Sequence, residues 1–560
     1  MYLGFWVSLF SIMKKGELRI MLNKTICECL KERMKHSPNE LALEYENIMF
    51  SWKELDSISD NAAIVFMRMG ITKGSHVGLW SCNSPNLVID FLALVKLGAI
   101  PIIMNTCYKE IELSRILEYA DVEFLCYGEG HKDMKYVDLL EKIPLWHPKK
   151  EHCIAIDKSK EGKWYGFREE YDDITPSELE KLNIQMKRVQ PEDTAAILFT
   201  SGTSKMPKGV MLSHYSLVNN SNAITSNMHW TNKDKMCVAV PMYHCFGITA
   251  SLLAAVHCGC ALHMLKQCKT AEIFHKIEEY HCTILNGVPT MFLAMMYNEK
   301  RKQFNLHSLQ SGIIAGSKIS PSEYLKICET FQMAHLQTSY GQTETSPCIT
   351  ISDFEDSIEI KADTSGKKIN NIQLRIFDNN AKQEAECGVI GEIQTKGYHV
   401  MQGYYKKQEE TKDTFTKDGW LKTGDLGYLD NKGYLHITGR IAEMIIRGGE
   451  NISPAEIEEC IKNYPDIKAV KVIGIKADVL QEEIAACIVP MDGKVINGER
   501  LKEYIKEKIA YYKVPKYILM FDNLPYTSNG KIALNELKQI VTDQLSTSCE
   551  AKGFETTKER

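Results

Sequence analysis

The stretch that decides the fold is "HVGLWSCNSPNLVIDFLALVKLGAIPIIMN", residues 76–105. Short apolar runs open and close it, at 76–80 and 100–105, and each has the length and composition of a buried strand. Between them lies an apolar segment long enough for a helix, and Ser84 and Pro85 are typical residues for a helix start. A strand, a helix and a second strand in this order indicate an α/β protein with a parallel sheet.

The same alternation continues on both sides of this stretch. Helical spacing is found at 25–36, and 40–52 is predicted to form a hairpin. The charged, poorly periodic region 149–188 is predicted to be a surface excursion, and a strand is expected again at 193–200. We therefore expect an α/β fold with a large N-terminal domain of layered α/β subdomains.

A smaller α+β unit is expected after a boundary near Gly439. We assign 21–438 to the N-terminal domain, 439–545 to the C-terminal domain and 546–560 to a flexible polar tail. The predicted elements of the smaller unit are strands at 469–477, 482–491 and 516–521 and a helix at 498–510.

The N-terminal segment is interpreted separately. Residues 2–13 are apolar and uncharged, but too few to span a bilayer as a helix, and the nearest lysines follow them instead of preceding them. We interpret 1–20 as a leader or a misassigned start, with Met13 or Met21 as the true beginning. The alternative is a weak membrane-surface anchor.

Composition narrows the class of protein. The chain has 560 residues and a net charge of −5, which is ordinary for a multidomain protein and argues against nucleic-acid binding. Its 18 cysteines show no disulfide framework, so we expect reduced thiols in a cytoplasmic protein. No integral membrane segment is predicted, and the oligomeric state cannot be read from the sequence.

A second stretch points to chemistry: "ILFTSGTSKMPKGVMLSH", residues 197–214. Hydroxyls, glycines and two lysines gather within 200–209, which suits a polyphosphate, because backbone N–H groups, hydroxyls and ammonium groups all bind such an anion. The spacing is not that of the ordinary P-loop, since Pro207 and Gly209 occupy positions of glycine and hydroxyl. From these residues alone, a phosphate loop and a solvated polar turn both remain open.

Four further stretches each contain one charged residue in a setting rich in glycine or hydroxyl residues. Taken singly, they have plain structural explanations: a carboxylate at a helix start, a turn-capping aspartate, or a surface lysine beside a hairpin. The stretches are "SYGQTETS" (339–346) with Glu344, "GWLKTGDLGYLD" (419–430) with Asp425, "GRIAEMIIRGGENISPAEIE" (439–458) with Arg440, and "LPYTSNGKIALNEL" (524–537) with Lys531.

Together and in this order, the five stretches resemble the adenylate-forming (AMP-binding) superfamily, which includes acyl-CoA synthetases, peptide-synthetase adenylation domains and firefly-type luciferases. The resemblance covers roughly 25–545. Within the superfamily, "GIIAGSKIS" (312–320), "YGQTET" (340–345) and "IIRGGENISPAEIE" (445–458) are most similar to the fatty acyl-CoA synthetase branch, especially its medium-chain members.

The resemblance implies a two-step ligase with a mobile C-terminal lid. A carboxylic acid substrate attacks ATP to give an acyl-adenylate and pyrophosphate, and coenzyme A then takes the acyl group and releases AMP. Mg²⁺ is the implied metal, with Glu344 as its ligand, because this hard cation prefers carboxylate and phosphate oxygens.

The resemblance also implies a set of nucleotide contacts. Thr343 is expected at the α-phosphate, Asp425 at the ribose hydroxyls, and Arg440 at ribose or phosphate. The β- and γ-phosphates are expected to be held by Thr200, Ser201, Gly202, Thr203, Ser204 and Lys208, and adenine by Gly316, Ser317, Tyr340 and Gly341.

Lys531 is the leading catalytic candidate. Attack of a carboxylate on a phosphate brings two anions together, and an ammonium group between them would stabilise the charge that develops. The smaller domain would then withdraw Lys531 and present Gly448 and Gly449, where the pantetheine arm of coenzyme A could pass close to the backbone.

Two positions depart from the pattern of the superfamily. Lys205 stands where a glycine is usual, which bears on the geometry of the phosphate loop, because lysine adopts a positive φ poorly. Ala442 stands where the hinge commonly has Asp or Lys, and Glu443 follows it, so domain alternation and the second step are less directly implied than the first.

The acyl pocket is assigned to "PMYHCFG" (241–247). His244 matches a family residue near the reacting carboxylate, and Phe246 and Gly247 would line the pocket; a buried, hydrogen-bonded core histidine is the alternative for His244. In "HCGCALH" (257–263) the small and apolar residues favour a buried helix end followed by a strand over a metal site.

Two rival functions remain. One is an adenylating enzyme that loads a separate carrier protein, and the other is a catalytically weak nucleotide-binding protein with a regulatory role. Acyl chain length depends on how distant segments pack, and cannot be deduced from the sequence.

Overall fold

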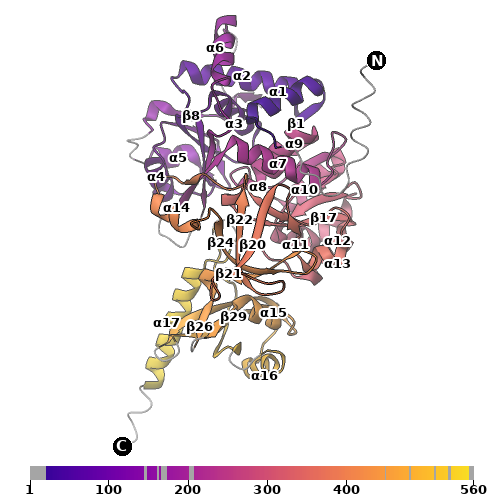
Figure 1. Cartoon of the computed structure of the whole chain (residues 1–560), viewed down its shortest axis with the longest axis vertical. Helices are drawn as coiled ribbons and strands as arrows, with labels where there is room; N and C mark the ends of the chain where they lie inside the picture. Colours follow the sequence, from indigo (N-terminus) through magenta and orange to yellow (C-terminus); the bar gives the residue numbers. More distant parts are fainter. Residues whose placement is uncertain are drawn as a thin grey trace, which may run out of the picture. The chain divides into compact units, whose positions relative to one another are not determined.

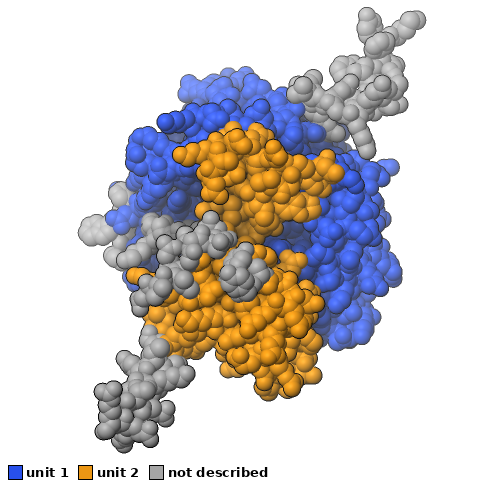
Figure 2. Space-filling model, turned by 60° about the horizontal axis from the view of Figure 1, so that its bottom comes forward, with its two compact units in different colours: residues 1–374, 394–422, 432–435 blue, residues 375–393, 423–431, 436–560 orange. Residues whose placement is uncertain are grey.

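The computed structural model describes most of the chain (Figure 1): residues 21–143, 148–160, 163–165, 173–200, 207–447, 450–477, 481–509, 513–527 and 531–553. The predicted leader, 1–20, lies outside the described residues. The chain forms two compact units, coloured separately in Figure 2: unit 1 is 1–374, 394–422 and 432–435, and unit 2 is 375–393, 423–431 and 436–560.

The strand–helix–strand prediction is confirmed. Ser84 caps the helix, with its side chain accepting a hydrogen bond from Leu87 N, Pro85 is the first helical residue, and Gly98 ends the helix with φ +71°. The elements are β3 (His76–Trp80), α3 (Pro85–Leu97) and β4 (Ile100–Ile103), with the strands parallel.

This unit extends into a seven-stranded sheet within the described part of unit 1, in the order β23-β12-β11-β4-β3-β5-β8. Its strands from β11 to β8 are parallel. β12 is antiparallel to β11, and β23 is antiparallel to β12. The further strands are β5 (Phe124–Tyr127), β8 (Cys153–Ala155), β11 (Thr194–Thr200), β12 (Lys208–Ser213) and β23 (Gly403–Tyr404).

The described part of unit 1 also holds a nine-stranded sheet, in the order β19-β18-β17-β16-β15-β13-β14-β1-β2. The strands from β1 to β17 are parallel. At the edges, β2 is antiparallel to β1, β18 is antiparallel to β17, and β19 is antiparallel to β18. The bounds are β1 (Leu41–Tyr45), β2 (Ile48–Ser51), β13 (Lys235–Val238), β14 (Ala261–Met264), β15 (Ile284–Leu285), β16 (Ser311–Ile314), β17 (His335–Gly341), β18 (Cys348–Ile351) and β19 (Lys367–Lys368).

Helices pack against these sheets. Figure 1 shows α1, α2, α3 and α6 lying together, and each contacts at least one of the others. The helices are α1 (Ile26–His36), α2 (Trp52–Arg68), α4 (Glu110–Tyr119), α5 (Tyr136–Leu140), α6 (Pro176–Met186), α7 (His214–Asn227), α8 (Cys245–Gly247), the π-helix η3 (Ile248–Leu253), α9 (Ala254–Cys258), α10 (Thr270–Tyr280), α11 (Pro289–Tyr297), α12 (Pro321–Phe331), α13 (Ile358–Asp363) and α14 (Gln408–Thr414).

One region differs from the prediction. The interpretation of 149–188 as a surface excursion is wrong in two places, because β8 pairs with β5 and α6 is a regular helix. The start of α6 is a capping box, in which Thr175 accepts from Glu178 N and the Glu178 carboxylate accepts from Thr175 N. That local signal outweighs the weak periodicity of the segment.

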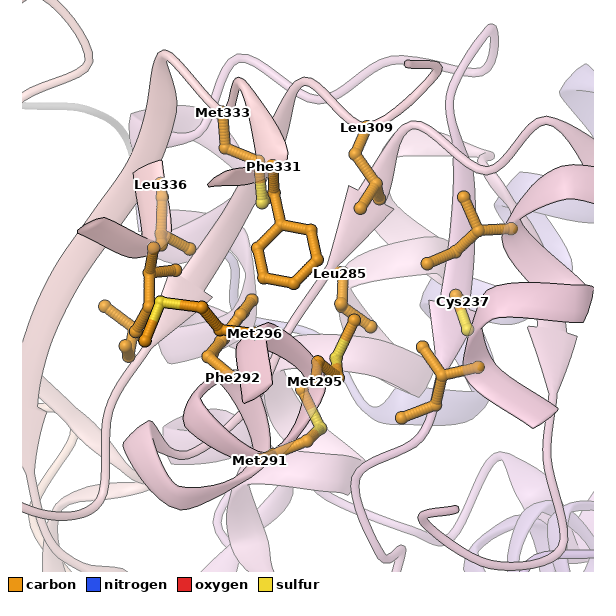
Figure 3. Close-up of a cluster of buried hydrophobic side chains, with 14 of the residues drawn as sticks. Cys237, Leu285, Met291, Phe292, Met295, Met296, Leu309, Phe331, Met333 and Leu336 are labelled. Carbon is orange, nitrogen blue, oxygen red and sulfur yellow. The ribbon is translucent and has the colours of Figure 1, made fainter. Parts of the chain in front are cut away.

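One core of unit 1 lies between α11, α12 and the nine-stranded sheet. Figure 3 shows the α11 side chains of this cluster, including Phe292 and three methionines, gathered near Phe331 and Leu336. Methionine adapts its shape to irregular gaps, which suits a helix that must fill the space between a sheet and a second helix.

In the described part of unit 2, a five-stranded sheet that contains β29 has helices on both faces. Alternate residues of β29 enter different clusters: Ile484, Ala486 and Ile488 pack with α15 and α16, whereas Ala485 and Cys487 pack with α17. This explains the unbroken apolar run at 484–489. The elements are β26 (Ile445–Arg447), β27 (Glu450–Ile452), β28 (Ile467–Ala477), β29 (Gln481–Pro490), β30 (Tyr517–Met520), α15 (Pro454–Lys462), α16 (Gly498–Lys508) and α17 (Leu534–Gly553).

A further five-stranded sheet has the order β21-β20-β22-β24-β25 in the described chain, and the division between the units runs through its strands. Its strands are β20 (Ile372–Asp378), β21 (Gln383–Glu384), β22 (Gly391–Gly397), β24 (Leu421–Leu429) and β25 (Leu435–Arg440). Beyond 545, α17 continues to Gly553, so helical structure enters the segment that we assigned to a tail.

Candidate active site

The phosphate-loop stretch joins two neighbouring strands of unit 1. β11 ends at Thr200 and the antiparallel β12 begins at Lys208; these two residues pair in the ladder, and Thr200 Oγ1 lies 3.5 Å from the Lys208 carbonyl oxygen that it donates to. The two ends of the loop are therefore held side by side. The candidates Ser201, Gly202, Thr203 and Ser204, and the departure Lys205, lie outside the described residues.

The residues expected at adenine gather where two parallel strands end. Gly316 and Ser317 are exposed just beyond β16, and Tyr340 and Gly341 end β17, which pairs with β16 in parallel register. The carboxyl ends of parallel strands are the usual place for a ligand in an α/β sheet. The structure thus brings these four candidates to one edge.

Gly341 also has a structural requirement. A Cβ atom built on it would stand 1.7 Å from the Pro347 carbonyl oxygen, far inside any real contact. Only glycine allows the turn after β17 to close on this backbone.

Glu344 lies in the short 3₁₀ helix η5 (Thr343–Thr345), directly after β17. Its Oε1 accepts a 2.8 Å hydrogen bond from the Tyr404 hydroxyl, and its carbonyl oxygen accepts a 2.9 Å bond from Met401 N. Among the described residues, nothing else is bonded to the Glu344 carboxylate. Thr343, the expected α-phosphate contact, is its neighbour and is half-buried.

The loop that carries Glu344 is anchored by a buried amide on α7. Asn220 Nδ2 donates to the Cys348 carbonyl oxygen at 2.8 Å and to that of Thr345 at 3.4 Å, and Asn220 Oδ1 accepts from Cys348 N at 3.1 Å. A fully bonded buried amide holds such a loop in one conformation. Sequence reasoning missed Asn220, because no local pattern links residue 220 to 348.

Tyr404 was missed as well. It pairs with Val210 between β23 and β12, its hydroxyl bonds to Glu344, and the Lys208 ammonium nitrogen lies 4.5 Å from the centroid of its ring. Burial, followed by the Glu344 carboxylate, raises the pKa of the Tyr404 hydroxyl above its usual range, so this group acts as the donor. Tyr404 therefore connects two predicted site residues.

In unit 2, Asp425 and Arg440 form an ion pair. Arg440 Nε donates to Asp425 Oδ1 at 2.7 Å; the Asp425 side chain is 5% exposed and that of Arg440 56%. The expectation of a turn at Asp425 is wrong, because it lies within β24, directly after Gly424 with φ +73°. Asp425 N donates to Thr423 Oγ1 at 3.1 Å, which fixes the local backbone.

Lys531 lies in unit 2, where its backbone is bonded to residues just before the undescribed stretch 528–530. Thr527 N donates to the Lys531 carbonyl oxygen at 2.7 Å, and Tyr526 bridges to Ile532. The side chain of Lys531 is exposed. The Asn-Gly pair of the predicted turn, at 529–530, lies outside the described residues.

The segment around the departure Ala442 contains a charged cluster. Glu443, in the 3₁₀ helix η6 (Ile441–Glu443), accepts a 2.9 Å hydrogen bond from Lys471 Nζ, which also forms a 3.1 Å ion pair with Glu458. The ionic contact of this segment is thus made one residue later than the position of Ala442. The predicted contacts for coenzyme A, Gly448 and Gly449, lie outside the described residues.

His244 precedes the short helix α8 and is exposed, so the alternative of a buried core histidine is wrong. Phe246 is half-buried. Gly247 is buried, and a Cβ atom on it would meet the Pro241 carbonyl oxygen at 2.3 Å, so glycine is needed here for backbone packing. These three candidates are adjacent, as the motif predicts.

A small apolar cavity adjoins this segment. Its volume is about 10 Å³, the space of roughly one water molecule, so it holds no acyl chain in this conformation. It is lined by Leu79, Leu87, Val88, Phe91, Ile103, Met242, Ile248 and Leu252.

The helix end and the strand expected at 257–263 are both present, but His257 and Cys258 at the helix end are half-buried. The helix α9 ends at Cys258, Gly259 adopts φ +84°, and the buried strand β14 begins at Ala261. In the described parts of the chain, no group of three or more His, Cys, Asp or Glu side chains is arranged to hold a metal ion.

Comparison with known proteins decides the family. A family model described as "AMP-binding enzyme" matches residues 30–405, and one described as "AMP-binding enzyme C-terminal domain" matches 456–531. The chain belongs to the AMP-binding enzyme family. The prediction of an adenylate-forming enzyme is confirmed, since the first model alone covers more than half of the chain.

Curated relatives match along nearly the whole chain. The putative acyl-CoA synthetase YngI of Bacillus subtilis (strain 168) is 35% identical over 94% of this chain and 99% of its own length. The mitochondrial medium-chain acyl-CoA ligase ACSF2 of Homo sapiens is 31% identical over 92% of this chain and 87% of its own length. The resemblance to the acyl-CoA synthetase branch is thus confirmed.

Solved structures share the fold. ATP-bound MatB of Rhodopseudomonas palustris superposes with a TM-score of 0.80 at 24% identity, covering 93% of this chain and 99% of that one. The o-succinylbenzoate CoA synthetase MenE of Bacillus subtilis, in complex with its acyl-adenylate, gives 0.75 at 25% identity, with coverages of 91% and 97%. The predicted α/β fold class is confirmed. Among the described helices, none has the length and apolar character needed to cross a bilayer.

Proposed function

We propose that this AMP-binding enzyme is an ATP-dependent acyl-CoA synthetase that activates a fatty carboxylate, with a medium-length chain as the finer assignment. The observation that carries the proposal is the grouping of Lys208 and Glu344 on Tyr404, beside the strand ends that frame the phosphate loop. The full-length match to relatives named as acyl-CoA synthetases and ligases supports the same reaction.

The first step forms the acyl-adenylate. A carboxylate oxygen of the substrate attacks the α-phosphorus of ATP, the bond to the bridging oxygen breaks, and pyrophosphate leaves. The protein contributes mainly position and charge, because the covalent changes occur between the two substrates. Lys531 is proposed to place its ammonium group between the attacking carboxylate and the α-phosphate.

The nucleotide contacts are proposed as the sequence predicts them. The phosphate loop, Lys208 and Thr343 take the phosphates, and the edge formed by β16 and β17 takes adenine. Asp425 takes the ribose hydroxyls, and its 2.7 Å pair with Arg440 supports this assignment, because the arginine aligns the carboxylate and adds a cation for phosphate.

Glu344 fits the donor set for Mg²⁺. One carboxylate oxygen is held by Tyr404, and the carboxylate accepts no other hydrogen bond from the described residues, so its remaining lone pairs are available to a cation. When bound, Mg²⁺ would neutralise phosphate charge as pyrophosphate leaves. The proposed role of Glu344 is to hold that ion.

The second step transfers the acyl group. The thiolate of coenzyme A attacks the carbonyl carbon of the acyl-adenylate, and AMP leaves from that carbon. Gly448 and Gly449 are proposed to admit the pantetheine arm. Beside Ala442, the neighbouring Glu443 bonds to Lys471 at 2.9 Å within unit 2, so this segment keeps an ionic contact in spite of the alanine.

The acyl group is proposed to lie beside His244, Phe246 and Gly247. The present cavity near Met242 and Ile248 is too small for it, so the substrate has to displace apolar side chains or use another opening. The cytoplasmic location stays a proposal. It is supported by free thiols at every cysteine whose side chain the structure describes, which is expected in a reducing compartment.

Two linked assays test the proposed function. Purified full-length protein is given ATP, Mg²⁺ and a series of straight-chain acids, and pyrophosphate exchange and CoA thioester are measured. We expect both signals, with an optimum at medium chain length. Exchange without thioester would support the loading of a carrier protein, and the absence of both would support the weak nucleotide-binding alternative; either result contradicts the proposal.

A further inference from the structure

Tyr404 is a buried tyrosine whose two ends contact different parts of the candidate site. It is 7% exposed. The hydroxyl bonds to Glu344, which lies 60 residues away in the chain, and the ring faces the Lys208 ammonium group. Few side chains can link an anion and a cation in this way without bringing the two charges into contact.

The hydroxyl fixes one oxygen of the Glu344 carboxylate. The 2.8 Å distance is that of a strong hydrogen bond to a charged acceptor, and it restricts rotation of the carboxylate about its terminal torsion. A second bond, from Met401 N to the Glu344 carbonyl oxygen, holds the backbone of the same residue. Both bonds come from 401–404, so this one segment orients the acid.

The aromatic ring of Tyr404 contacts a second predicted site residue, Lys208. Lys208 Nζ lies 4.5 Å from the ring centroid, within the range of a cation–π contact. The backbones are also joined, because Val210 pairs with Tyr404 and Tyr405 N donates to the Gly209 carbonyl oxygen at 2.8 Å. The position of the Lys208 ammonium group over the Tyr404 ring therefore depends on the pairing of β12 with β23 as well as on the cation–π contact.

We propose that Tyr404 is the positioning residue of the nucleotide site: its hydroxyl orients Glu344 for the divalent cation, and its ring orients Lys208 for the phosphates. This inference rests on the proposed function. Tyr404 itself touches neither substrate, and acts through the two residues that do.

The neighbouring residue provides a matched control. Tyr405 also donates its hydroxyl to a carboxylate, Asp121, at 2.6 Å, but this contact is exposed and joins the α4–β5 connection instead of η5. Tyr404→Phe and Tyr405→Phe thus remove the same chemical group from adjacent positions, and only the first removes it from Glu344.

The test measures metal binding directly. Mn²⁺ is titrated, by electron paramagnetic resonance, into full-length protein saturated with a non-hydrolysable ATP analogue. We expect Tyr404→Phe to weaken Mn²⁺ binding about 10-fold, as loss of a residue that orients a metal ligand usually does. Tyr405→Phe should keep the affinity of the unsubstituted protein. Equal effects of the two substitutions, or an unchanged affinity for Tyr404→Phe, would overturn the inference.

Two further variants separate positioning from general packing. In a Glu344→Gln background, Tyr404→Phe should weaken Mn²⁺ binding by less than twofold more, because the group that it orients is already lost. Tyr404→Leu should raise the KM for ATP about 10-fold beyond Tyr404→Phe at saturating Mg²⁺, since it also removes the ring beneath Lys208. If Tyr404→Phe weakens Mn²⁺ binding as much in the Glu344→Gln background as alone, its role in orienting Glu344 is contradicted. If Tyr404→Phe and Tyr404→Leu have equal KM values for ATP, the role of the ring is contradicted.

The same experiment distinguishes this inference from the function on which it rests. If the unsubstituted protein binds no Mn²⁺ with the analogue and catalyses no pyrophosphate exchange, the proposed function fails. If the unsubstituted protein does both and Tyr404→Phe behaves like Tyr405→Phe, only the role of Tyr404 fails.

Discussion

At the residue scale, some positions need a particular charged side chain, and others need glycine because there is no room for a side chain. Lys531 is an exposed cation, Asp425 is a buried carboxylate paired with Arg440, and Gly341 is a position where a Cβ atom would overlap a carbonyl oxygen. The first two requirements are chemical and the third is steric, so they predict different kinds of failure.

Lys531→Ala should separate the two half-reactions. Adenylate formation should fall by a factor of about 10² or more, because the cation is needed where charge develops. Thioester formation from supplied acyl-adenylate should be largely spared. Pyrophosphate exchange measures the first step and CoA thioester release from acyl-adenylate the second; an equal fall in both would refute the assigned role.

Gly341→Ala should destabilise the protein whether or not adenine binds there. The added methyl group must displace the Pro347 carbonyl, which we expect to lower the free energy of unfolding by about 1–3 kcal/mol. Urea unfolding measures this change. Gly498→Ala is the control, since its Cβ would meet its nearest atom, of Ile518, at 3.7 Å, an ordinary contact. Similar stability for both variants would contradict the steric argument.

At the element scale, ionic contacts join three helices of unit 1. Lys96 of α3 is completely buried and donates to Asp56 and Ser59 of α2 at 2.9 and 2.8 Å and to Asp60 at 2.6 Å. Lys31 of α1 bonds to the same two carboxylates, but its side chain is 26% exposed. The cluster therefore ties α1, α2 and α3 together.

The two lysines should differ in their contribution to stability. Lys96→Met removes one of the two lysines that pair with Asp56 and Asp60. Because these carboxylates are largely shielded from water, the change should lower the free energy of unfolding by about 3 kcal/mol. Lys31→Met should cost about 1 kcal/mol or less, because water can replace its ammonium group. Urea unfolding at neutral pH distinguishes the two, and equal losses would show that burial does not control this network.

At the scale of the whole molecule, buried groups couple stability to pH. His214 is completely buried, and its Nδ1 accepts a 3.3 Å hydrogen bond from Ile26 N, which ties the start of α1 to the start of α7. Burial lowers the pKa of His214 from 6.5 to about 4. The ring is therefore neutral in the folded protein across the physiological range.

This coupling has a definite sign. Because the folded pKa is depressed, the unfolded chain binds the proton first as the pH falls below 6.5, and the stability due to neutral His214 is lost progressively down to about pH 4. The loss at pH 5 is on the order of 2 kcal/mol. The free energy of unfolding, measured with urea, should fall less between pH 8 and pH 5 for His214→Gln than for the unsubstituted protein.

His275→Gln is the matched control for this pH dependence. Its side chain is 69% exposed and, among the described residues, its only ionic partner is the exposed Glu279 of the same helix, at 3.5 Å, so the substitution should change the loss of stability much less than His214→Gln does. If the free energy of unfolding falls equally with pH in His214→Gln and in the unsubstituted protein, another group causes the pH dependence.

Much of the fold follows from local patterns. Ser84, Pro85 and Gly98 mark the ends of α3 because capping depends only on neighbouring residues, and the boundaries of β3 and β4 follow from short apolar runs. The region 149–188 was misjudged because the prediction rested on charge and poor periodicity and overlooked the capping box at Thr175. The turn expected at Asp425 was wrong because Gly424, although its φ is +73°, lies within the continuous strand β24.

By itself, the sequence determined the family, the α/β class, the order of the elements and the types of residue that the chemistry needs, because motifs, caps and periodicity are properties of nearby residues. Only the tertiary structure decided which side chains meet. The contacts of Tyr404 with Glu344 and of Asn220 with Cys348 join segments 60 and 128 residues apart. Such contacts depend on how sheets and helices pack, and packing leaves no period or spacing in the chain that could be read in advance.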